Sequence, residues 1–379
     1  MKKLGFGYMR LPLMDDQDKK SFDFETLNAM VDAFMDRGFT YFDTAYVYHD
    51  YQSEKALRES LVKRYPRESF TVATKLPMRD FHTKEEMGKI FNEQLENCGV
   101  DYFDYYMLHN IGHNSYKKAV EFDSFDFGFQ KKKEGKVKKF GFSFHETPEL
   151  LEEIFQKYPG LDFVQLQLNY VDWDHPNIQS RRCLELANQY EIPVIVMEPI
   201  KGGNLVQVPE KAEMLMKTYD SNASIPSWAL RFAASQKGVF MVLSGMNAME
   251  QIEDNMNALD PFIPLNEREY SIIGQVVEAI NEYTAIDCTT CGYCEKECPQ
   301  NIAIPDYFSL YNSAKRNTGD NRSSQFVYYM NLTATRGKAS DCIECRKCES
   351  ACPQHLEISQ LLKDVAAEFE KGPGLPSRK

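Results

Sequence analysis

The sequence has little that would direct the chain to a membrane, to nucleic acid or out of the cell. No apolar run is long enough to cross a bilayer. The amino-terminal MKKLGFGYMRLP has two lysines but lacks the hydrophobic stretch that a secretory signal needs. Acidic residues outnumber basic ones, 56 to 44, and the net charge of −12 argues against a surface that binds nucleic acid. We therefore expect a cytoplasmic protein with neither a membrane nor a nucleic-acid partner.

The chain contains ten cysteines, and eight of them stand in two copies of one motif. CTTCGYCEKECPQ and CIECRKCESACPQ begin 54 residues apart and share the spacing C-x2-C-x2-C-x3-C-P. In bacterial ferredoxins this spacing lets three thiolates hold one [4Fe–4S] cluster while the fourth reaches the neighbouring cluster. We therefore predict two clusters, the first held by Cys288, Cys291, Cys294 and Cys352 and the second by Cys342, Cys345, Cys348 and Cys298.

Disulfides and zinc are the alternatives for these cysteines. Disulfide scaffolds are usually short secreted chains, and nothing here indicates export. Zinc is bound by two C-x2-C pairs, whereas this chain repeats a triplet together with its Cys-Pro. The two remaining cysteines, Cys98 and Cys183, stand alone and are expected to be small, buried apolar side chains.

Strand-like runs alternate with amphipathic segments over residues 1–285. The eight runs span 4–9, 39–45, 70–75, 102–109, 137–143, 162–169, 193–199 and 239–245. Such alternation implies a parallel sheet, and eight repeats over roughly 250 residues favour a closed TIM (β/α)8 barrel over an open sheet. No G-x-G-x-x-G follows a strand and opens a helix, which weakens the Rossmann alternative.

A smaller, mainly α-helical ferredoxin-like domain is predicted over 286–379. Between and around the cysteine motifs, PDYFSLYNSAKR (305–316) and SSQFVYYMNLTATRG (323–337) have helical spacing of their apolar residues. The last nine residues, KGPGLPSRK, are rich in glycine and proline and are expected to fray.

Polar residues at the carboxyl ends of consecutive strands form a candidate active site, because barrels of this type place their chemistry there. Asp43 ends the second run and Tyr48 follows it, while Lys75 and His109 end the third and fourth runs. A lysine ammonium lowers the pKa of a neighbouring tyrosine, and a carboxylate holds the lysine charged and oriented. The tuned phenol would act as a general acid on a carbonyl oxygen that the histidine positions, while hydride arrives at carbon.

These residues carry a resemblance to a known family. FDTAYVYH (42–49), VATK (72–75) and LHN (108–110) resemble motifs of the aldo-keto reductases, including their Asp–Tyr–Lys–His tetrad. With the double cysteine motif added, the chain is similar to the ferredoxin-containing branch of that family. The resemblance implies an NAD(P)H-dependent barrel fused to an iron–sulfur domain, with a small carbonyl or alcohol substrate. By the same resemblance the catalytic set is Asp43, Tyr48, Lys75 and His109.

The resemblance also implies cofactor-binding residues, with departures from the family pattern. Ser143 would hold the nicotinamide amide, but Phe144 replaces the asparagine that usually follows. Met197 stands where many relatives have a ring-stacking tyrosine. No arginine lies in the adenosine-binding segment 243–255, which argues against a strong preference for NADPH, although Lys201 would compensate. The implied set is Gly7, Ser143, Gln165, Asn169, Met197, Pro199, Lys201, Gly202, Ser244, Gly245, Gln251 and Asn255.

Three interpretations of the whole chain stay open. Hydride carries two electrons and a cubane cluster takes one at a time, so a flavin would ordinarily link them; the loops IKGG and LSGM are where a barrel would bind its phosphate. The first interpretation is an oxidoreductase whose clusters relay electrons to or from a partner protein. The second is an electron-transfer protein whose barrel is a docking or flavin-binding scaffold. In the third, the clusters only stabilise the carboxyl-terminal part.

Overall fold

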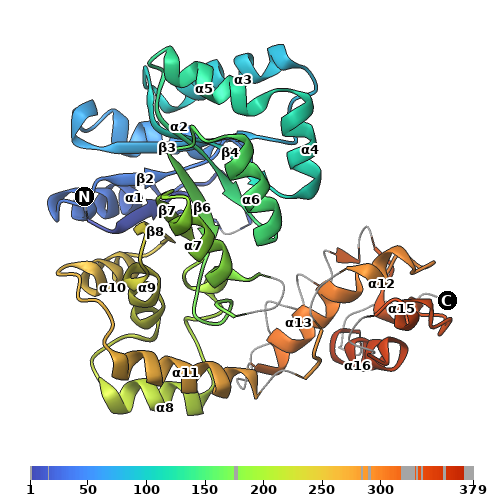
Figure 1. Ribbon diagram of the computed structural model, residues 1–379. Helices are drawn as coiled ribbons and strands as arrows, with labels where there is room; N and C mark the ends of the chain where they lie inside the picture. Colours follow the sequence, from blue (N-terminus) through green and yellow to red (C-terminus); the bar gives the residue numbers. More distant parts are fainter. Residues whose placement is uncertain are drawn as a thin grey trace. The chain divides into compact units, whose positions relative to one another are not determined.

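The chain packs into two compact units in a computed structural model (Figure 1). The residues described are 2–15, 17–174, 178–282, 285–288, 292–316, 329, 332–333, 336–352 and 356–370. The first unit comprises Met1–Gln207 and Asn222–Tyr270, and the second comprises Val208–Ser221 and Ser271–Lys379. The domain boundary expected after residue 285 stays a prediction.

Eight parallel strands close into a barrel in the first unit. Each strand pairs with the next along the chain, and β8 pairs with β1. The strands are β1 (Leu4–Gly7), β2 (Tyr41–Asp43), β3 (Thr71–Pro77), β4 (Phe103–Ile111), β5 (Val137–Phe144), β6 (Phe163–Gln167), β7 (Val194–Met197) and β8 (Val239–Gly245). This confirms the predicted barrel, and each strand overlaps a predicted run. The expectation that strands end at Lys75 and His109 is wrong, because β3 and β4 continue two residues further.

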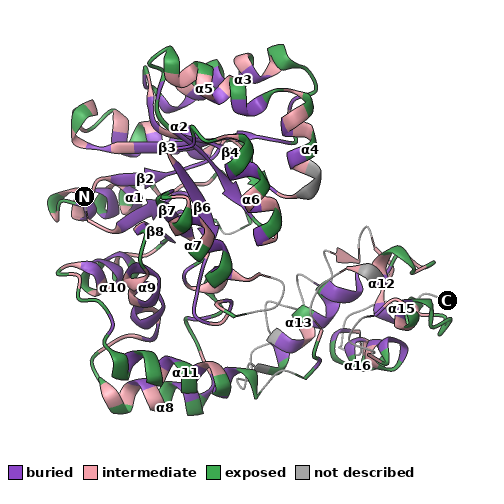
Figure 2. Cartoon of the chain, in the orientation of Figure 1, coloured by how far each residue is buried: buried purple, intermediate pink, exposed green. Residues whose placement is uncertain are grey.

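Helices follow the strands and bury one face each. In the first of them the buried residues Leu27, Met30, Val31 and Phe34 recur at helical spacing, and the Asp23 side chain caps the amino end. Figure 2 shows buried strands and helices whose outer faces are exposed. The helices of this unit are α1 (Phe24–Asp36), α2 (Ser53–Leu57) with its π-helical continuation η1 (Arg58–Val62), η2 (Arg67–Ser69), α3 (Lys84–Cys98), α4 (His113–Glu121), α5 (Ser124–Lys133), α6 (Pro148–Lys157), α7 (Ser180–Gln189), η3 (Lys201–Gly203), α9 (Ile225–Ser235) and α10 (Met249–Leu259).

A layer of buried side chains fills the barrel and determines which residues lie above it. This layer consists of Tyr41, Ala73, Met107, Phe163, Ile195, Met241 and Leu243. Because side chains alternate in direction along a strand, the residue two positions later on each strand also points into the barrel. Those later residues are Asp43, Lys75, His109, Gln165, Met197 and Gly245, all of them sequence candidates. The strand register therefore gathers the candidates at the carboxyl end of the barrel.

The second unit contains a helical repeat that follows the cysteine motifs. The two long helices α13 (Ile304–Arg316) and α16 (Ile358–Phe369) begin 54 residues apart, as do the short helices α12 (Tyr293–Lys296) and α15 (Lys347–Ser350). The remaining elements are α8 (Glu210–Tyr219), η4 (Ala339–Asp341) and most of α11 (Glu267–Asn281). The described elements of this unit are helical, as predicted.

Some expectations for this unit lie outside the described residues. They concern most of the helix expected at 323–337 and the tail 371–379. In the part of the chain that the structure describes, no helix has both the length and the apolar composition that a membrane span requires.

Candidate active site and cysteine motifs

Asp43 and Lys75 form an ion pair at the carboxyl end of the barrel, and this pair is shielded from water. Their side chains are 4% and 1% exposed, and Nζ of Lys75 lies 2.5 Å from Oδ1 of Asp43. The ammonium also donates to the carbonyl oxygen of Thr44, at 2.7 Å. Burial alone lowers the pKa of Lys75, but the charge of Asp43 and the phenol of Tyr48 outweigh it, so this pKa is raised. Lys75 is therefore a fixed cation at neutral pH.

Tyr48 meets this cation from the loop after β2. Nζ of Lys75 lies 5.1 Å from the centre of the Tyr48 ring. Burial raises the pKa of Tyr48, and the charge of Lys75 opposes that rise without cancelling it. The charge of Lys75 lowers the pKa of Tyr48, as predicted. The expectation of an unusually acidic phenol is wrong, because burial raises this pKa by more than the lysine lowers it. The phenol is therefore protonated at neutral pH, with a cation beside it.

His109 completes the tetrad from β4. Its ring meets the Tyr48 ring edge-on, with 5.7 Å between ring centres and 83° between planes. Burial lowers the pKa of His109 to about 3, and the neighbouring basic groups of Lys75, His145 and Arg79 add to the effect. The imidazole is therefore neutral throughout the physiological range, able to donate one hydrogen bond and accept another.

A second buried carboxylate, Glu54, lies on the outer side of β3. Thr74 Oγ1 and Gln94 Nε2 donate to its Oε1 at 2.7 and 2.8 Å, and the same Gln94 amide donates to the backbone oxygen of Lys75 at 3.0 Å. Burial raises the pKa of Glu54 to about 7. Sequence reasoning missed this residue, although its spacing from Leu57 and Leu61 places it on the apolar face of its helix.

The predicted cofactor-binding residues all lie at the carboxyl end of the barrel or in the segments that follow. Gly7 ends β1, Ser143 lies in β5, Gln165 lies in β6, Asn169 follows β6, Met197 ends β7, Pro199 follows it, Lys201 and Gly202 lie in η3, Ser244 and Gly245 end β8, and Gln251 and Asn255 lie in α10. The closed barrel therefore brings segments that are distant in the sequence to one rim.

Two buried oxygen atoms at this rim have unused hydrogen-bonding capacity. Oε1 of Gln165 and Oδ2 of Asp43 are inaccessible to water, and within the described part of the chain neither has a hydrogen-bond partner. Buried polar atoms nearly always have a partner. The side chains therefore fit a ligand that brings its own N–H or O–H donors to this position.

Other candidates are engaged in holding the loops. The backbone N–H of Asn110 donates to Oγ of Ser143 at 2.7 Å. Asn255 Nδ2 donates to Oγ of Ser244 at 3.1 Å. Asn169 Nδ2 donates to Oδ2 of Asp172 at 2.7 Å. The first bond ties the end of β5 to β4, the second ties the end of β8 to α10, and the third lies within the segment after β6.

Lys201 has a partner that the sequence did not indicate. Its ammonium lies 2.5 Å from Oδ1 of Asp172, whose side chain is completely buried. Its own φ of 49° and the φ of 66° at Gly202 place both residues in the left-handed region, which a glycine adopts without strain. The loop after β7 is therefore tied to the loop after β6 by an ion pair, and this pair occupies the lysine expected to reach a phosphate.

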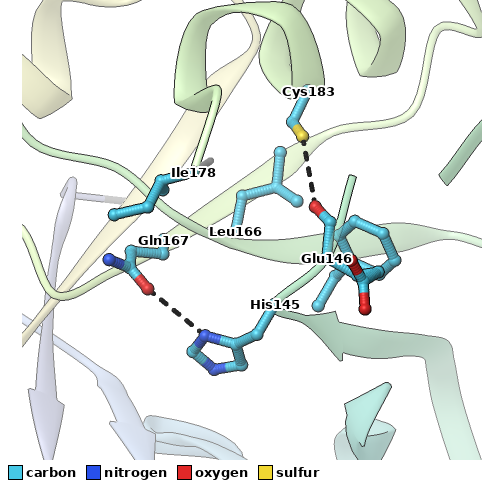
Figure 3. Close-up of a pocket in the computed structure, with 7 residues that line it drawn as sticks. His145, Glu146, Leu166, Gln167, Ile178 and Cys183 are labelled. Carbon is cyan, nitrogen blue, oxygen red and sulfur yellow. Dashed lines mark hydrogen bonds between the residues drawn. The ribbon is translucent and has the colours of Figure 1, made fainter. Parts of the chain in front are cut away.

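A pocket opens at the ends of β5 and β6 (Figure 3). It encloses about 380 Å³, part of it open to solvent, and is lined by Phe144, His145, Glu146, Leu166, Gln167, Ile178 and Cys183. Nδ1 of His145 lies 3.3 Å from Oε1 of Gln167. Burial raises the pKa of the Cys183 thiol to about 12. Cys98 and Cys183 are both buried, as predicted.

The cysteine motifs contribute to the core of the second unit. Cys294, Cys348 and Cys352 belong to it, Cys288, Cys298 and Cys342 pack against it, and Cys345 is exposed. Cys291 lies outside the described residues. Burial raises the pKa of Cys348 to about 11, and Cys342 and Cys298 add to the effect. Cys298 of the first motif therefore lies within electrostatic reach of Cys348 of the second.

The described parts of the two motifs share two backbone features. Gly292 and Arg346, equivalent residues in the two copies, have left-handed φ values of 75° and 56° and precede α12 and α15. Near the end of each motif, the N–H of Cys298 or Cys352 bonds a carbonyl three residues earlier, at 3.2 Å in both. Among the described residues, no three His, Cys, Asp or Glu side chains form a group that could hold a metal ion. The ligand sets of the clusters therefore stay a prediction.

Comparisons with known proteins match two families, one after the other along the chain. Residues 3–278 match the model of the Aldo/keto reductase family, and residues 287–356 match that of the 4Fe-4S dicluster domain. The NADH-specific methylglyoxal reductase of Escherichia coli (strain K12) is 24% identical over 290 residues, covering 64% of this chain and 85% of that protein. The L-galactose dehydrogenase of Arabidopsis thaliana is 26% identical over 270 residues, covering 66% and 80%.

The solved structures that resemble this chain share its barrel. An aldo-keto reductase from Klebsiella pneumoniae in complex with NADPH superposes with a TM-score of 0.58 at 19% identity, covering 73% of this chain and 90% of that chain. A likeness at this level of identity supports the fold.

Proposed function

The chain is an oxidoreductase that belongs to the aldo/keto reductase family and carries a 4Fe-4S dicluster domain, and on that basis we propose that it interconverts a small carbonyl compound and its alcohol with NAD(P)H. One observation carries the proposal: Asp43, Tyr48, Lys75 and His109 converge at the carboxyl end of one closed barrel. The names of two relatives, a methylglyoxal reductase and an L-galactose dehydrogenase, support a substrate of this class.

The residues divide the work around the carbonyl oxygen. Bound NAD(P)H supplies the hydride that reaches the substrate carbon. Tyr48, protonated at neutral pH, donates its proton to the oxygen. The Lys75 ammonium, held by Asp43, stabilises the phenolate that remains. Neutral His109 donates an N–H to the same oxygen and orients it.

The rim of the barrel fits a nicotinamide. Oε1 of Gln165 needs a donor, and a carboxamide supplies one. Met197 offers an apolar surface where many relatives stack a tyrosine. The segment 243–255 contains no arginine for a 2′-phosphate, so we expect NADH to bind at least as well as NADPH. The E. coli relative is named as NADH-specific, which agrees with this expectation.

Two [4Fe–4S] clusters are proposed for the second unit. Cys288, Cys291, Cys294 and Cys352 would hold one, and Cys342, Cys345, Cys348 and Cys298 the other. The matching dicluster domain and the closeness of Cys298 to Cys348 support these sets. When bound, the clusters supply one-electron transfer, which suits exchange with a redox partner protein. A flavin linking the two chemistries would be found by extracting the anaerobically purified protein and analysing the supernatant for FMN and FAD.

A second function, electron transfer without carbonyl chemistry, is favoured by one observation. Cys345 is exposed, so a cluster bound there would lie near the surface, where a partner can approach. Anaerobic stopped-flow mixing with NADH tests it. Bleaching of the clusters at the same rate with and without a carbonyl substrate would favour this function over the first.

The test of the main proposal replaces Tyr48 by phenylalanine. Carbonyl reduction is followed by loss of NADH absorbance with methylglyoxal and a panel of aldehydes. A positioned general acid contributes about 10²- to 10⁴-fold, and Tyr48→Phe should lose that factor. Tyr46→Phe is the matched control, because its hydroxyl lies in the same loop but donates to Glu93 at 3.0 Å. Equal losses in the two variants would refute the assignment.

A further inference from the structure

Arg10 bridges two loops at the rim of the barrel, and sequence reasoning did not single it out. It follows β1, and its Nη2 donates to the carbonyl oxygen of Gly202 at 3.2 Å. Its side chain lies along Gly245: a β-carbon built at that glycine would lie 3.3 Å from the Cβ of Arg10 and 3.5 Å from its Cγ. Arg10 therefore contacts the segment after β7 and the end of β8 at once.

Among the residues that the structure describes, no carboxylate forms an ion pair with Arg10. Within the described part of the chain its polar contact is the bond to Gly202, and the residue is exposed. That bond uses Nη2, and the donors on Nε and Nη1 have no partner among the described residues, which leaves them available to a ligand. Lys201, the other cation of this rim considered for a phosphate, is paired with the buried Asp172. Arg10 is thus the better placed of the two cations to receive an anion.

The surroundings of Arg10 suit a phosphate. Gly202 in η3 and Gly245 at the end of β8 lie against Arg10, and neither has a side chain that would keep an anion away from the backbone. Barrels of this type frequently bind phosphate with the loops after strands seven and eight. Because β8 pairs with β1 in the closed barrel, a residue that follows β1 lies beside the loop after β8.

We propose that Arg10 binds the pyrophosphate of the dinucleotide cofactor, while Lys201 holds the neighbouring loop through Asp172. The inference rests on the proposed use of NAD(P)H. A guanidinium presents a planar fork of donors that matches two phosphate oxygens, which an ammonium does not. Arg10 is distinct from the tetrad residues, so its loss weakens cofactor binding without removing the acid that protonates the substrate.

The experiment measures binding by the full-length, iron-loaded protein under anaerobic conditions. NADH, NADPH and ADP-ribose are titrated by calorimetry into wild type, Arg10→Gln and Arg10→Lys. Loss of charged hydrogen bonds should raise Kd about 10- to 100-fold for Arg10→Gln, equally for all three nucleotides. Arg10→Lys keeps the charge without the planar fork of donors, so its Kd should lie between those of wild type and Arg10→Gln. Arg37→Gln, the same substitution at the opposite end of the barrel, should leave Kd unchanged.

The outcomes separate this inference from the proposed function. Unchanged binding by Arg10→Gln, with tight binding by wild type, overturns the role of Arg10 and leaves the proposed function standing. Weakening of NADPH alone overturns the pyrophosphate assignment, because it places Arg10 on the 2′-phosphate. If Arg10→Gln weakens the binding of FMN alone, the residue binds a flavin phosphate and the pyrophosphate assignment is likewise overturned. Failure of wild type to bind any of the nicotinamide nucleotides overturns both proposals. Equal melting temperatures of wild type and Arg10→Gln, expected for an exposed residue, exclude misfolding as the cause.

Discussion

The ammonium of Lys75 lies 2.5 Å from the carboxylate of Asp43, and neither side chain is more than 4% exposed. Separating such a pair leaves a charge in a medium that cannot solvate it. The pair joins β2 to β3 by side chains in addition to backbone bonds. It also fixes the cation over which the Tyr48 ring lies. The same contact thus contributes to folding and to chemistry, and the two effects can be measured separately.

Replacing Asp43 by asparagine should destabilise the protein and abolish carbonyl reduction. Removing one partner of a buried ion pair costs about 3–5 kcal/mol in the free energy of unfolding. The pair Lys63–Glu59 provides the control, because both side chains are about half exposed and Glu59→Gln should cost less than about 1 kcal/mol. Urea denaturation measured anaerobically compares the two. A similar small loss in both variants would contradict the structural account of the pair.

The pH dependence of stability should reveal the ionisation of Glu54. Burial raises its pKa to about 7, so the folded state binds a proton that the unfolded state has released above its ordinary pKa of about 4.5. The stability from this group is therefore complete below about pH 4.5 and is lost as pH rises through about 7. Relative to Glu54→Gln, wild type should lose on the order of 2 kcal/mol between pH 5 and 8. Parallel unfolding profiles for the two proteins would show that this carboxylate does not titrate there.

His109 should act as a neutral donor, which a glutamine can partly replace. Its pKa of about 3 means that the imidazole does not change charge between pH 5 and 8. We expect His109→Leu to lower kcat by about 10²- to 10³-fold, the usual effect of removing a donor to the reacting oxygen. His109→Gln keeps an N–H donor and should retain more activity. Steady-state rates across pH 5–8 test this, and an inflection present in wild type but absent from both variants would contradict a neutral histidine.

Paired cysteine substitutions should reveal which thiols share a cluster. The proposed sets place Cys298 with Cys342, and Cys294 in the other cluster. Adding Cys342→Ser to Cys298→Ser should therefore cause little further loss of iron, whereas adding Cys294→Ser should remove iron from both clusters. Iron analysis starts from about eight irons per wild-type chain. Cys183→Ser, buried in the first unit, is the control with wild-type iron. If the double variant Cys298→Ser, Cys342→Ser loses as much iron as the two single variants together, Cys298 does not share a cluster with Cys342 and the proposed sets are contradicted.

Periodicity in the sequence was enough to predict the barrel and the position of the tetrad. Strand residues such as Tyr41 and Asp43, or Ala73 and Lys75, repeat every second position, so knowing the strands identifies which side chains enter the barrel. The cysteine spacing likewise predicted a duplicated unit, and the equivalent turns at Gly292 and Arg346 agree with it.

The remaining features depend on contacts between segments that are distant along the chain. Arg10 meets Gly202 across 192 residues, and Lys201 meets Asp172 across 29, and no local pattern indicates either pair. The pKa of Tyr48 could not be predicted either. Burial of the ring raises this pKa and the charge of Lys75 lowers it, so the direction depends on which effect is larger. The depth of burial and the distance to the charge cannot be obtained from a sequence.

Transfer of deuterium from [4,4-²H₂]NADH, in which both transferable hydrogens are deuterium, to a carbonyl carbon tests the central claim most directly. Wild type incubated with methylglyoxal should yield alcohol carrying one deuterium at the former carbonyl carbon, detected by mass spectrometry. Tyr48→Phe should bind the cofactor with unchanged Kd and form this product at least about 100-fold more slowly. Product without deuterium, or formation by Tyr48→Phe at the wild-type rate, would contradict hydride transfer assisted by this tyrosine.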